Sequence, residues 1–149
     1  MNEVIKRGTA YFLSLCVITI LFVYVLNLPE FISQSPDLVI EYYHKQALSS
    51  FVLDIFLIAA YISVAMYVGK LLKINQNDHV QQLLALIVTI VVISGAFMLY
   101  FTMGGSPGTF FSRWFKRVGY KAIVYDVFFI CSIYILMLVF YNSKIFKRI

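Results

Sequence analysis

Two aspartates are the residues of this sequence whose type and position best suit chemistry. Asp54 and Asp126 each lie about five residues inside a long apolar segment, at a depth of about 7–8 Å if the segments are helices. An ionised carboxylate inside a bilayer costs about 2.5–3.5 kcal/mol on insertion scales, so it normally faces a protein interior or water. Two carboxylates at one depth can also hold a shared proton or a cation when they lie close together. The pair therefore suggests a proton or cation site.

The same depth also suggests a structural role. A basic side chain from the segment before each aspartate, such as Lys45, Arg117 or Lys121, could reach the carboxylate by snorkelling. Each aspartate would then be a pin that fixes an interfacial helix to the span that follows it. The sequence favours the pin over the ion site, and simple exposure to headgroup water is the third alternative.

The apolar segments offer little else that could carry chemistry. They contain no further Lys, Arg, His, Glu or Asp, and away from the aspartates they offer only scattered Ser, Thr, Tyr and Cys, which argues against an ion pathway. Cys16 and Cys131 form no C-x-x-C pair, and this disfavours a thiol oxidoreductase. His44 and His79 lie in loops predicted on opposite sides of the membrane, so they cannot share a metal. We find no nucleotide-binding, hydrolase or calcium-binding motif, and expect no catalytic residue, metal, cofactor or enzyme activity.

Composition places these residues in a membrane protein. The chain has 149 residues, 62% of them hydrophobic and 13% charged, which is more apolar surface than a soluble domain of this size can bury. Each of four apolar runs has roughly 20 residues, enough for a helix to cross a ~30 Å hydrocarbon core. We predict an all-α, four-helix transmembrane bundle that forms one integral membrane domain over residues 1–149. The predicted spans are residues 9–28, 49–69, 83–103 and 122–141.

Lysine and arginine indicate the orientation of the predicted bundle. Four spans place both termini on one side, where the termini and the loop 70–82 carry seven Lys or Arg, against five on the opposite side. The positive-inside rule therefore favours cytoplasmic termini, with these cations near anionic lipid headgroups. The seven cations are Lys6, Arg7, Lys70, Lys73, Lys144, Lys147 and Arg148.

A shift of 72 residues aligns the chain with itself. Residues 41–63 (EYYHKQALSSFVLDIFLIAAYIS) then lie over residues 113–135 (RWFKRVGYKAIVYDVFFICSIYI). An aromatic pair, a basic pair and the intramembrane aspartate follow in the same order in both segments. We predict two repeated helical hairpins, about residues 9–69 and 83–141, related by a pseudo-twofold axis along the membrane normal. Transporters use repeats of this kind, and so do passive bundles.

Each predicted hairpin has a short amphipathic helix on one side of the membrane, before its second span. The second copy places aromatic residues on one face and cations on the other, typical of a helix in the headgroup layer with aromatics toward the acyl chains. The first loop is acidic, with three acids against one lysine, whereas the third loop carries four cations and no acid. We expect the second amphipathic helix to meet a partner. The predicted interfacial and docking residues are Arg113, Trp114, Phe115, Lys116, Arg117 and Lys121.

The head of the last span carries a family resemblance. The segment GYKAIVYDVFFICSIYIL (residues 119–136), with the basic and aromatic segment before it, resembles small multi-span membrane proteins of large double-stranded DNA viruses that infect algae and amoebae. The resemblance covers about 25 of the 149 residues. It implies a minor capsid protein that ties the internal membrane of the virion to the capsid shell, with termini toward the virion interior and no catalytic residues.

The leading functional prediction is a non-enzymatic structural protein that anchors a larger membrane-associated assembly. Its partners would be anionic lipid headgroups and other protein subunits, without direct contact to nucleic acid. Two alternatives stay open at this point: a small proton or cation transporter or channel that uses Asp54 and Asp126, and an accessory subunit of a membrane enzyme complex.

Overall fold

The computed structural model describes residues 2–75 and 77–143, and within these residues every regular element is a helix. Four of the helices are long and apolar enough to cross a membrane, which confirms the predicted all-α architecture with four spans. The first span is α1 (Glu3–Thr19) continued by the π-helical segment η1 (Ile20–Val25). The other three spans are α4 (Ala47–Leu71), α5 (His79–Thr102) and α7 (Tyr120–Asn142).

Polar residues determine where the spans begin and end. The side chains of Asn2 and Asp78 cap α1 and α5 by accepting hydrogen bonds from backbone N–H groups, at 3.2 and 3.0 Å. Both helices therefore begin before the predicted spans at residues 9 and 83, because hydropathy marks only the apolar part of a helix. The first span ends at Val25 instead of residue 28, since Asn27 takes a left-handed conformation with φ of 48°.

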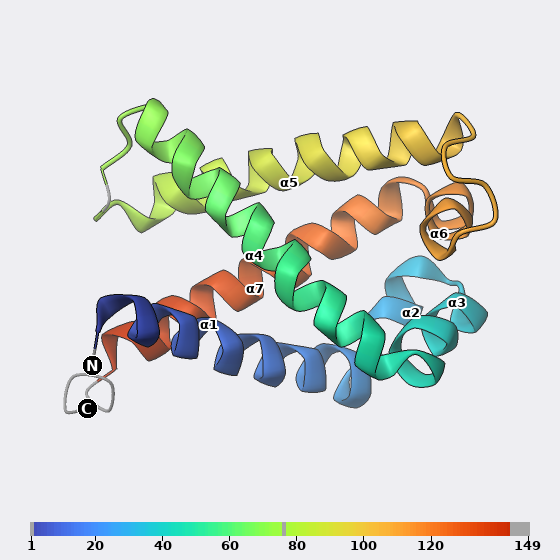
Figure 1. Ribbon diagram of the computed structural model, residues 1–149, viewed down its shortest axis with the longest axis horizontal. Helices are drawn as coiled ribbons and strands as arrows, with labels where there is room; N and C mark the ends of the chain where they lie inside the picture. The colour runs from blue at the N-terminus through green and yellow to red at the C-terminus, as the bar shows by residue number, and fades with distance from the viewer. Residues whose placement is uncertain (1, 76, 144–149) are drawn as a thin grey trace.

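The two ends of the bundle differ in architecture (Figure 1). One end, which we name the terminal end, holds the start of α1, the end of α7 and the adjoining ends of α4 and α5. At the opposite end, short helices form a cap: α2 (Leu28–Ser33), α3 (Pro36–Ile40), the π-helical η2 (Glu41–Lys45) and α6 (Phe110–Val118). Between the ends, α4 and α7 run as crossing diagonals, with α1 and α5 on opposite sides of them. Helix α1 packs along α7, and α5 packs against both diagonals.

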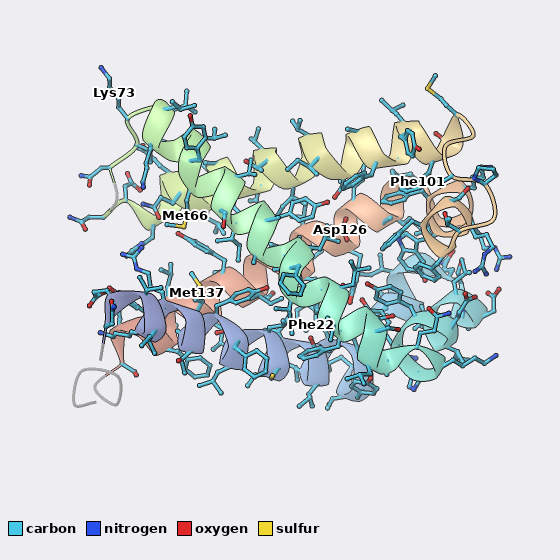
Figure 2. All side chains as sticks on the ribbon, viewed as in Figure 1. Phe22, Met66, Lys73, Phe101, Asp126 and Met137 are labelled. Atoms are coloured by element: carbon cyan, nitrogen blue, oxygen red, sulfur yellow. The ribbon has the colours of Figure 1, made fainter. Side chains whose placement is uncertain are left out.

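The outer surface of the spans is apolar. Large hydrophobic side chains such as Leu84, Val88 and Val92 on α5, or Phe128 and Ile135 on α7, point away from the bundle and are exposed. Charged side chains gather instead at the two ends, as Lys73 does at the terminal end in Figure 2. This distribution is the one expected of a multi-pass membrane protein, whose sides face lipid and whose ends face water.

The aromatic face of α6 packs against the protein, which contradicts the prediction that it faces the acyl chains. Trp114 and Phe115 are only 8% and 5% exposed. The ring of Phe115 stacks on Phe101 of α5, with 5.7 Å between centroids, and Phe110 stacks on Tyr42 of η2 at 4.8 Å. Trp114 stacks on Phe110 of its own helix. Because Trp114 and Phe115 are buried, their side chains leave little surface for a separate partner.

The cap is closed by ion pairs between its acidic and basic halves. Arg113 donates two hydrogen bonds to the carboxylate of Glu41, at 2.7 and 2.6 Å, and Arg117 pairs with Asp37 at 2.5 Å. These guanidinium groups hold the pKa of Glu41 and Asp37 below their usual values, and the Glu41 carboxylate raises the pKa of Arg113. The opposite charges of the two loops therefore serve to hold the cap together.

Of the remaining predicted docking residues, Lys121 donates to the side-chain oxygen of Gln34 at 2.7 Å, and Lys116 is exposed. The cations Lys144, Lys147 and Arg148, predicted to contact lipid headgroups, lie outside the described residues.

The Arg113–Glu41 pair predicts a salt- and pH-dependent contribution to stability. A cycle of Arg113→Gln, Glu41→Gln and the double variant should show favourable coupling in the free energy of unfolding in micelles, at neutral pH and low salt. Because the folded-state pKa of Glu41 is lowered, the coupling is complete above the pKa of a free glutamate and disappears as the pH falls through the folded-state value. Added salt should weaken it. Zero coupling at low salt and neutral pH would contradict the pairing.

A glycine allows the sharp corner between α6 and α7. Gly119 has φ of 59° and ψ of −135°, a combination that residues with a Cβ atom rarely adopt. An added Cβ would meet no atom within 4 Å, so the backbone conformation alone requires glycine here. The corner turns the chain from the cap into α7 and so sets the position of Asp126 relative to α6.

We therefore expect Gly119→Ala to lower the free energy of unfolding by about 1–3 kcal/mol, measured by denaturant titration in micelles. Gly95→Ala is the matched control, because Gly95 lies inside α5 and an added Cβ there also meets nothing within 4 Å. In a helix alanine is favoured over glycine, so the control should be neutral or stabilising. Equal losses in both variants would show that the corner has no special requirement.

Candidate functional site

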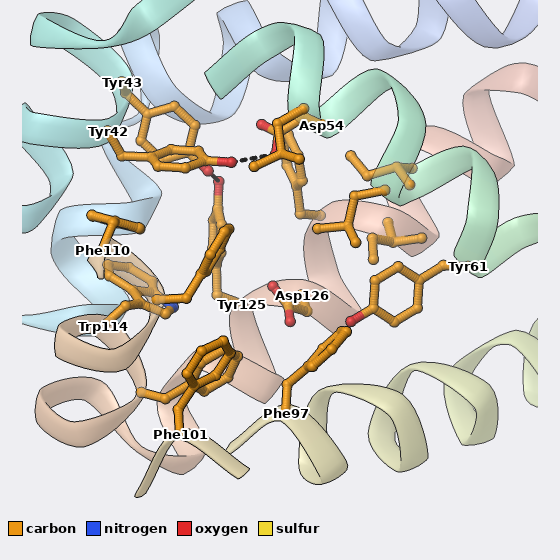
Figure 3. A pocket seen from close by; sticks show the side chains of 17 residues that line it. Tyr42, Tyr43, Asp54, Tyr61, Phe97, Phe101, Phe110, Trp114, Tyr125 and Asp126 are labelled. Atoms are coloured by element: carbon orange, nitrogen blue, oxygen red, sulfur yellow. Dashed lines mark hydrogen bonds between the residues drawn. The ribbon is translucent and has the colours of Figure 1, made fainter. Parts of the chain in front are cut away.

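A cavity of about 230 Å³ lies between α4, α5, α7 and the cap (Figure 3). Its walls are mostly aromatic, and both intramembrane aspartates line it. The seventeen lining residues are Tyr42, Tyr43, Leu53, Asp54, Leu57, Ile58, Tyr61, Phe97, Phe101, Phe110, Phe111, Trp114, Phe115, Tyr125, Asp126, Phe129 and Ile130.

Helical periodicity aims Asp54 into the bundle. On α4 the buried residues Ser50, Asp54, Ile58 and Tyr61 follow one another at spacings of three and four, so they form one inward stripe. The Asp54 carboxylate is only 7% exposed and accepts a hydrogen bond of 2.7 Å from the hydroxyl of Tyr42. Tyr42 belongs to η2, the segment directly before α4, so this bond ties the cap to the span that follows.

Asp126 of α7 is held by a chain of two hydroxyl groups, from α5 and α4. Ser94 of α5 donates to the Asp126 carboxylate at 2.7 Å, and the Ser94 oxygen lies 2.8 Å from the hydroxyl of Tyr61 on α4. Because the single hydroxyl hydrogen of Ser94 is used for Asp126, Tyr61 must be the donor in the second bond. Asp126 remains partly exposed, on the wall of the cavity.

Two further tyrosines complete the polar part of the wall. The hydroxyls of Tyr43 and Tyr125 lie 3.0 Å apart and join the cap to α7. Burial raises the pKa of Tyr43, and burial together with the charge of Asp54 raises that of Tyr42, far above the usual value for a tyrosine. Both hydroxyls therefore keep their protons at physiological pH, and Tyr42 acts as a hydrogen-bond donor to Asp54.

The predicted partners of the two aspartates were wrong. Within the described residues, Arg117 pairs with Asp37 and Lys121 donates to Gln34. The groups that donate hydrogen bonds to the intramembrane carboxylates are the hydroxyls of Tyr42 and Ser94. Asp54 is still fixed to the segment before its span, but through a hydrogen bond from Tyr42 of η2 instead of an ion pair. Asp126 is linked to α5 instead of its own amphipathic helix, so the pin does not repeat.

Some of the site could be read from the sequence and some could not. The prediction named Asp54, Asp126, Trp114 and Phe115, and the structure brings all four to one cavity. It missed the hydroxyl partners Tyr42, Tyr61 and Ser94. Tyr61 follows Asp54 by seven residues, a spacing that places both on one helix face and could have indicated it. Ser94 belongs to another helix, and no spacing connects it to Asp126.

A second hollow, of about 520 Å³, occupies the terminal half of the bundle between α1, α4, α5 and α7. Polar side chains line it, whereas the sequence suggested only scattered hydroxyls in this half. Tyr134 of α7 lines this hollow and donates to Gln82 at 2.7 Å, while Ile130, one helical turn earlier, lines the cavity. The polar lining side chains are Arg7, Tyr11, Ser63, Lys70, Asn77, His79, Gln82, Tyr134, Tyr141 and Asn142.

On α7 the linings of the two hollows lie close together. The α7 residue Ile133 and the α5 residue Ile90 are both 0% exposed. Along α7, Ile133 lies between Ile130, which lines the cavity, and Tyr134, which lines the second hollow. On this helix the two linings are therefore about one turn apart, or about 6 Å.

Comparison with protein-family models, with curated proteins and with solved structures gives no match to this chain. The resemblance to viral membrane proteins stays a prediction. Within residues 2–75 and 77–143, no three His, Cys, Asp or Glu side chains are grouped to hold a metal ion.

The hydroxyl chain predicts a difference between two serines. Ser94→Ala should lower the free energy of unfolding by about 1–3 kcal/mol, because the half-buried Asp126 carboxylate loses its hydrogen-bond donor. Ser132→Ala should change it little, since the Ser132 hydroxyl bonds only to the carbonyl oxygen of Phe128 in its own helix. Denaturant titration in micelles measures both. Equal effects of the two substitutions would show that Ser94 does not stabilise Asp126.

Proposed function

We propose that this chain is a small membrane transporter that carries a cation in exchange for protons, with Asp54 and Asp126 as the groups that bind both. The observation that carries the proposal is the shared cavity: the two carboxylates found within the spans line the same hollow and reach it from different helices. This is the second of the functions that the sequence left open.

The electrostatics of the cavity favour a cation. The described residues that line it include no Lys, Arg or His. The two carboxylates are surrounded by rings and neutral hydroxyls, and a buried charge without a counter-ion is unfavourable. A proton or a bound cation neutralises each carboxylate, so the two compete for the same groups.

The second hollow supports transport of the cation across the membrane, and not only its binding. A carrier needs a binding site that communicates with each side of the membrane in turn. Here the linings of the cavity at the cap end and of the hollow at the terminal end are about one helical turn apart on α7, and the fully buried Ile133 lies between them. A small shift of the crossing helices α4 and α7 would open the site to the other side.

We also propose that the chain consists of two repeated hairpins. The pairing of Glu41 with Arg113 supports this, because these residues are separated by 72 positions, the shift that aligns the chain with itself. Residues at equivalent positions meet near a twofold axis. A twofold axis that relates the two hairpins would pair α1 with α5 and α4 with α7. In Figure 1, α4 and α7 cross each other, and α1 and α5 lie on opposite sides of them.

The structural role in a larger assembly, predicted first from the sequence, stays a prediction. So do the accessory-subunit role, the viral membrane, the orientation of the termini and the absence of enzyme activity. The docking surface on which the structural role relied is reduced, because Arg113 and Arg117 pair with acids of the same chain.

Flux through proteoliposomes tests the proposal. With a pH gradient and an internal pH dye, a panel of inorganic and organic monocations should include at least one that dissipates the gradient faster than in empty liposomes. The double variant Asp54→Asn, Asp126→Asn should remove this flux.

Asp78→Asn is the matched control, because asparagine caps a helix as well as aspartate and Asp78 lies outside both hollows. It should transport like the unmodified chain. Equal flux in the unmodified chain and the double variant, for every cation, would overturn the proposal.

A further inference from the structure

We infer that the cation is an organic ammonium ion that carries a single apolar ring. This inference rests on the proposed function and specifies its substrate. It follows from three properties of the cavity: the material of its walls, its volume and the position of its charges.

The walls suit a ring better than a metal ion. Eleven of the seventeen lining residues are aromatic and four are aliphatic. A bare metal cation requires several oxygen ligands at about 2.0–2.6 Å. The oxygens of this cavity come from two carboxylates and four tyrosines, and the tyrosine hydroxyls already take part in hydrogen bonds. An ammonium ion can instead lie against ring faces, which attract a positive charge.

Stacked rings form a continuous aromatic wall that starts beside Asp54 and leads away from it. Tyr42 stacks on Phe110 at 4.8 Å between centroids, and Phe110 stacks on Trp114 at 5.8 Å. Figure 3 shows Phe110 and Trp114 on one side of the cavity and the two aspartates on the other. A ligand with a ring at one end and a charged nitrogen at the other matches this polarity.

The volume limits the ligand to one ring with a short arm. The cavity measures about 230 Å³, and an apolar cavity of about 150 Å³ in another protein binds benzene. A single ring with a small ammonium group therefore fits. Inorganic monocations would leave most of the space unfilled.

Benzyltrimethylammonium is a suitable probe, because its charge is permanent and changes of pH affect only the protein. Its neutral analogue neopentylbenzene has the same shape, and tetramethylammonium has the charge without the ring. Trp114 is the single tryptophan of the chain and lines the cavity, so its fluorescence reports occupancy. The chain is reconstituted in phosphatidylcholine nanodiscs, at a pH where the carboxylates are ionised.

We expect saturable binding of benzyltrimethylammonium, at least tenfold tighter than that of either neopentylbenzene or tetramethylammonium. Asp54→Asn and Asp126→Asn should each weaken the binding of benzyltrimethylammonium at least tenfold and leave that of neopentylbenzene unchanged or tighter. This second measurement shows that the variants still fold with the cavity intact. Asp78→Asn should bind all three probes like the unmodified chain.

The remaining outcomes separate the two proposals. If Na⁺ or K⁺ releases protons in an aspartate-dependent manner while benzyltrimethylammonium does not bind, the ring-bearing substrate is wrong and the transporter proposal stands. If no cation binds or releases protons, both are wrong. If neopentylbenzene binds as tightly as its charged analogue, the cavity recognises shape without charge, and the inference fails.

Discussion

The need to satisfy two carboxylates away from water constrains much of this structure. An unneutralised charge within the spans is costly, so each aspartate must face inward and find donors there. Tyr42 supplies one donor and Ser94 the other, and each bond links different elements. The bond from Tyr42 holds η2 against α4, and the chain from Tyr61 through Ser94 to Asp126 connects α4, α5 and α7. The polar contacts that stabilise the carboxylates thus also position the helices around the cavity.

The charged side chains of the cap are stabilised differently from the two intramembrane carboxylates. Its charges lie at the end of the bundle, where water screens them, and its acids and bases neutralise one another. Within residues 2–75 and 77–143, neither carboxylate of the spans forms a salt bridge. The separation of the two charge systems underlies our proposal of a positive ligand, since a lysine or arginine beside Asp54 would occupy the site.

The spans and the inward aspartates could be predicted from the sequence, because hydropathy and the cost of a buried charge act on single segments. The short helices of the cap were also expected, at the correct end. The sequence could not reveal what covers them: the face of α6 with Trp114 and Phe115 has the pattern of a lipid-facing helix, yet Phe101 and neighbouring rings bury it. Pairings such as Ser94 with Asp126 join segments distant in the sequence, and only the packing of the helices determines them.

The position of the aspartates along their helices also has an electrical consequence. Asp54 and Asp126 both lie in the first third of their helices, toward the cap end. A charge that moves between the cap side and the cavity crosses the smaller part of the membrane voltage, and one that moves between the cavity and the terminal side crosses the larger part. A full crossing involves about 2.3 kcal/mol per charge at 100 mV. If the proposed exchange takes place, voltage acts mainly on its step toward the terminal side, and binding from the cap side experiences about a third of the voltage.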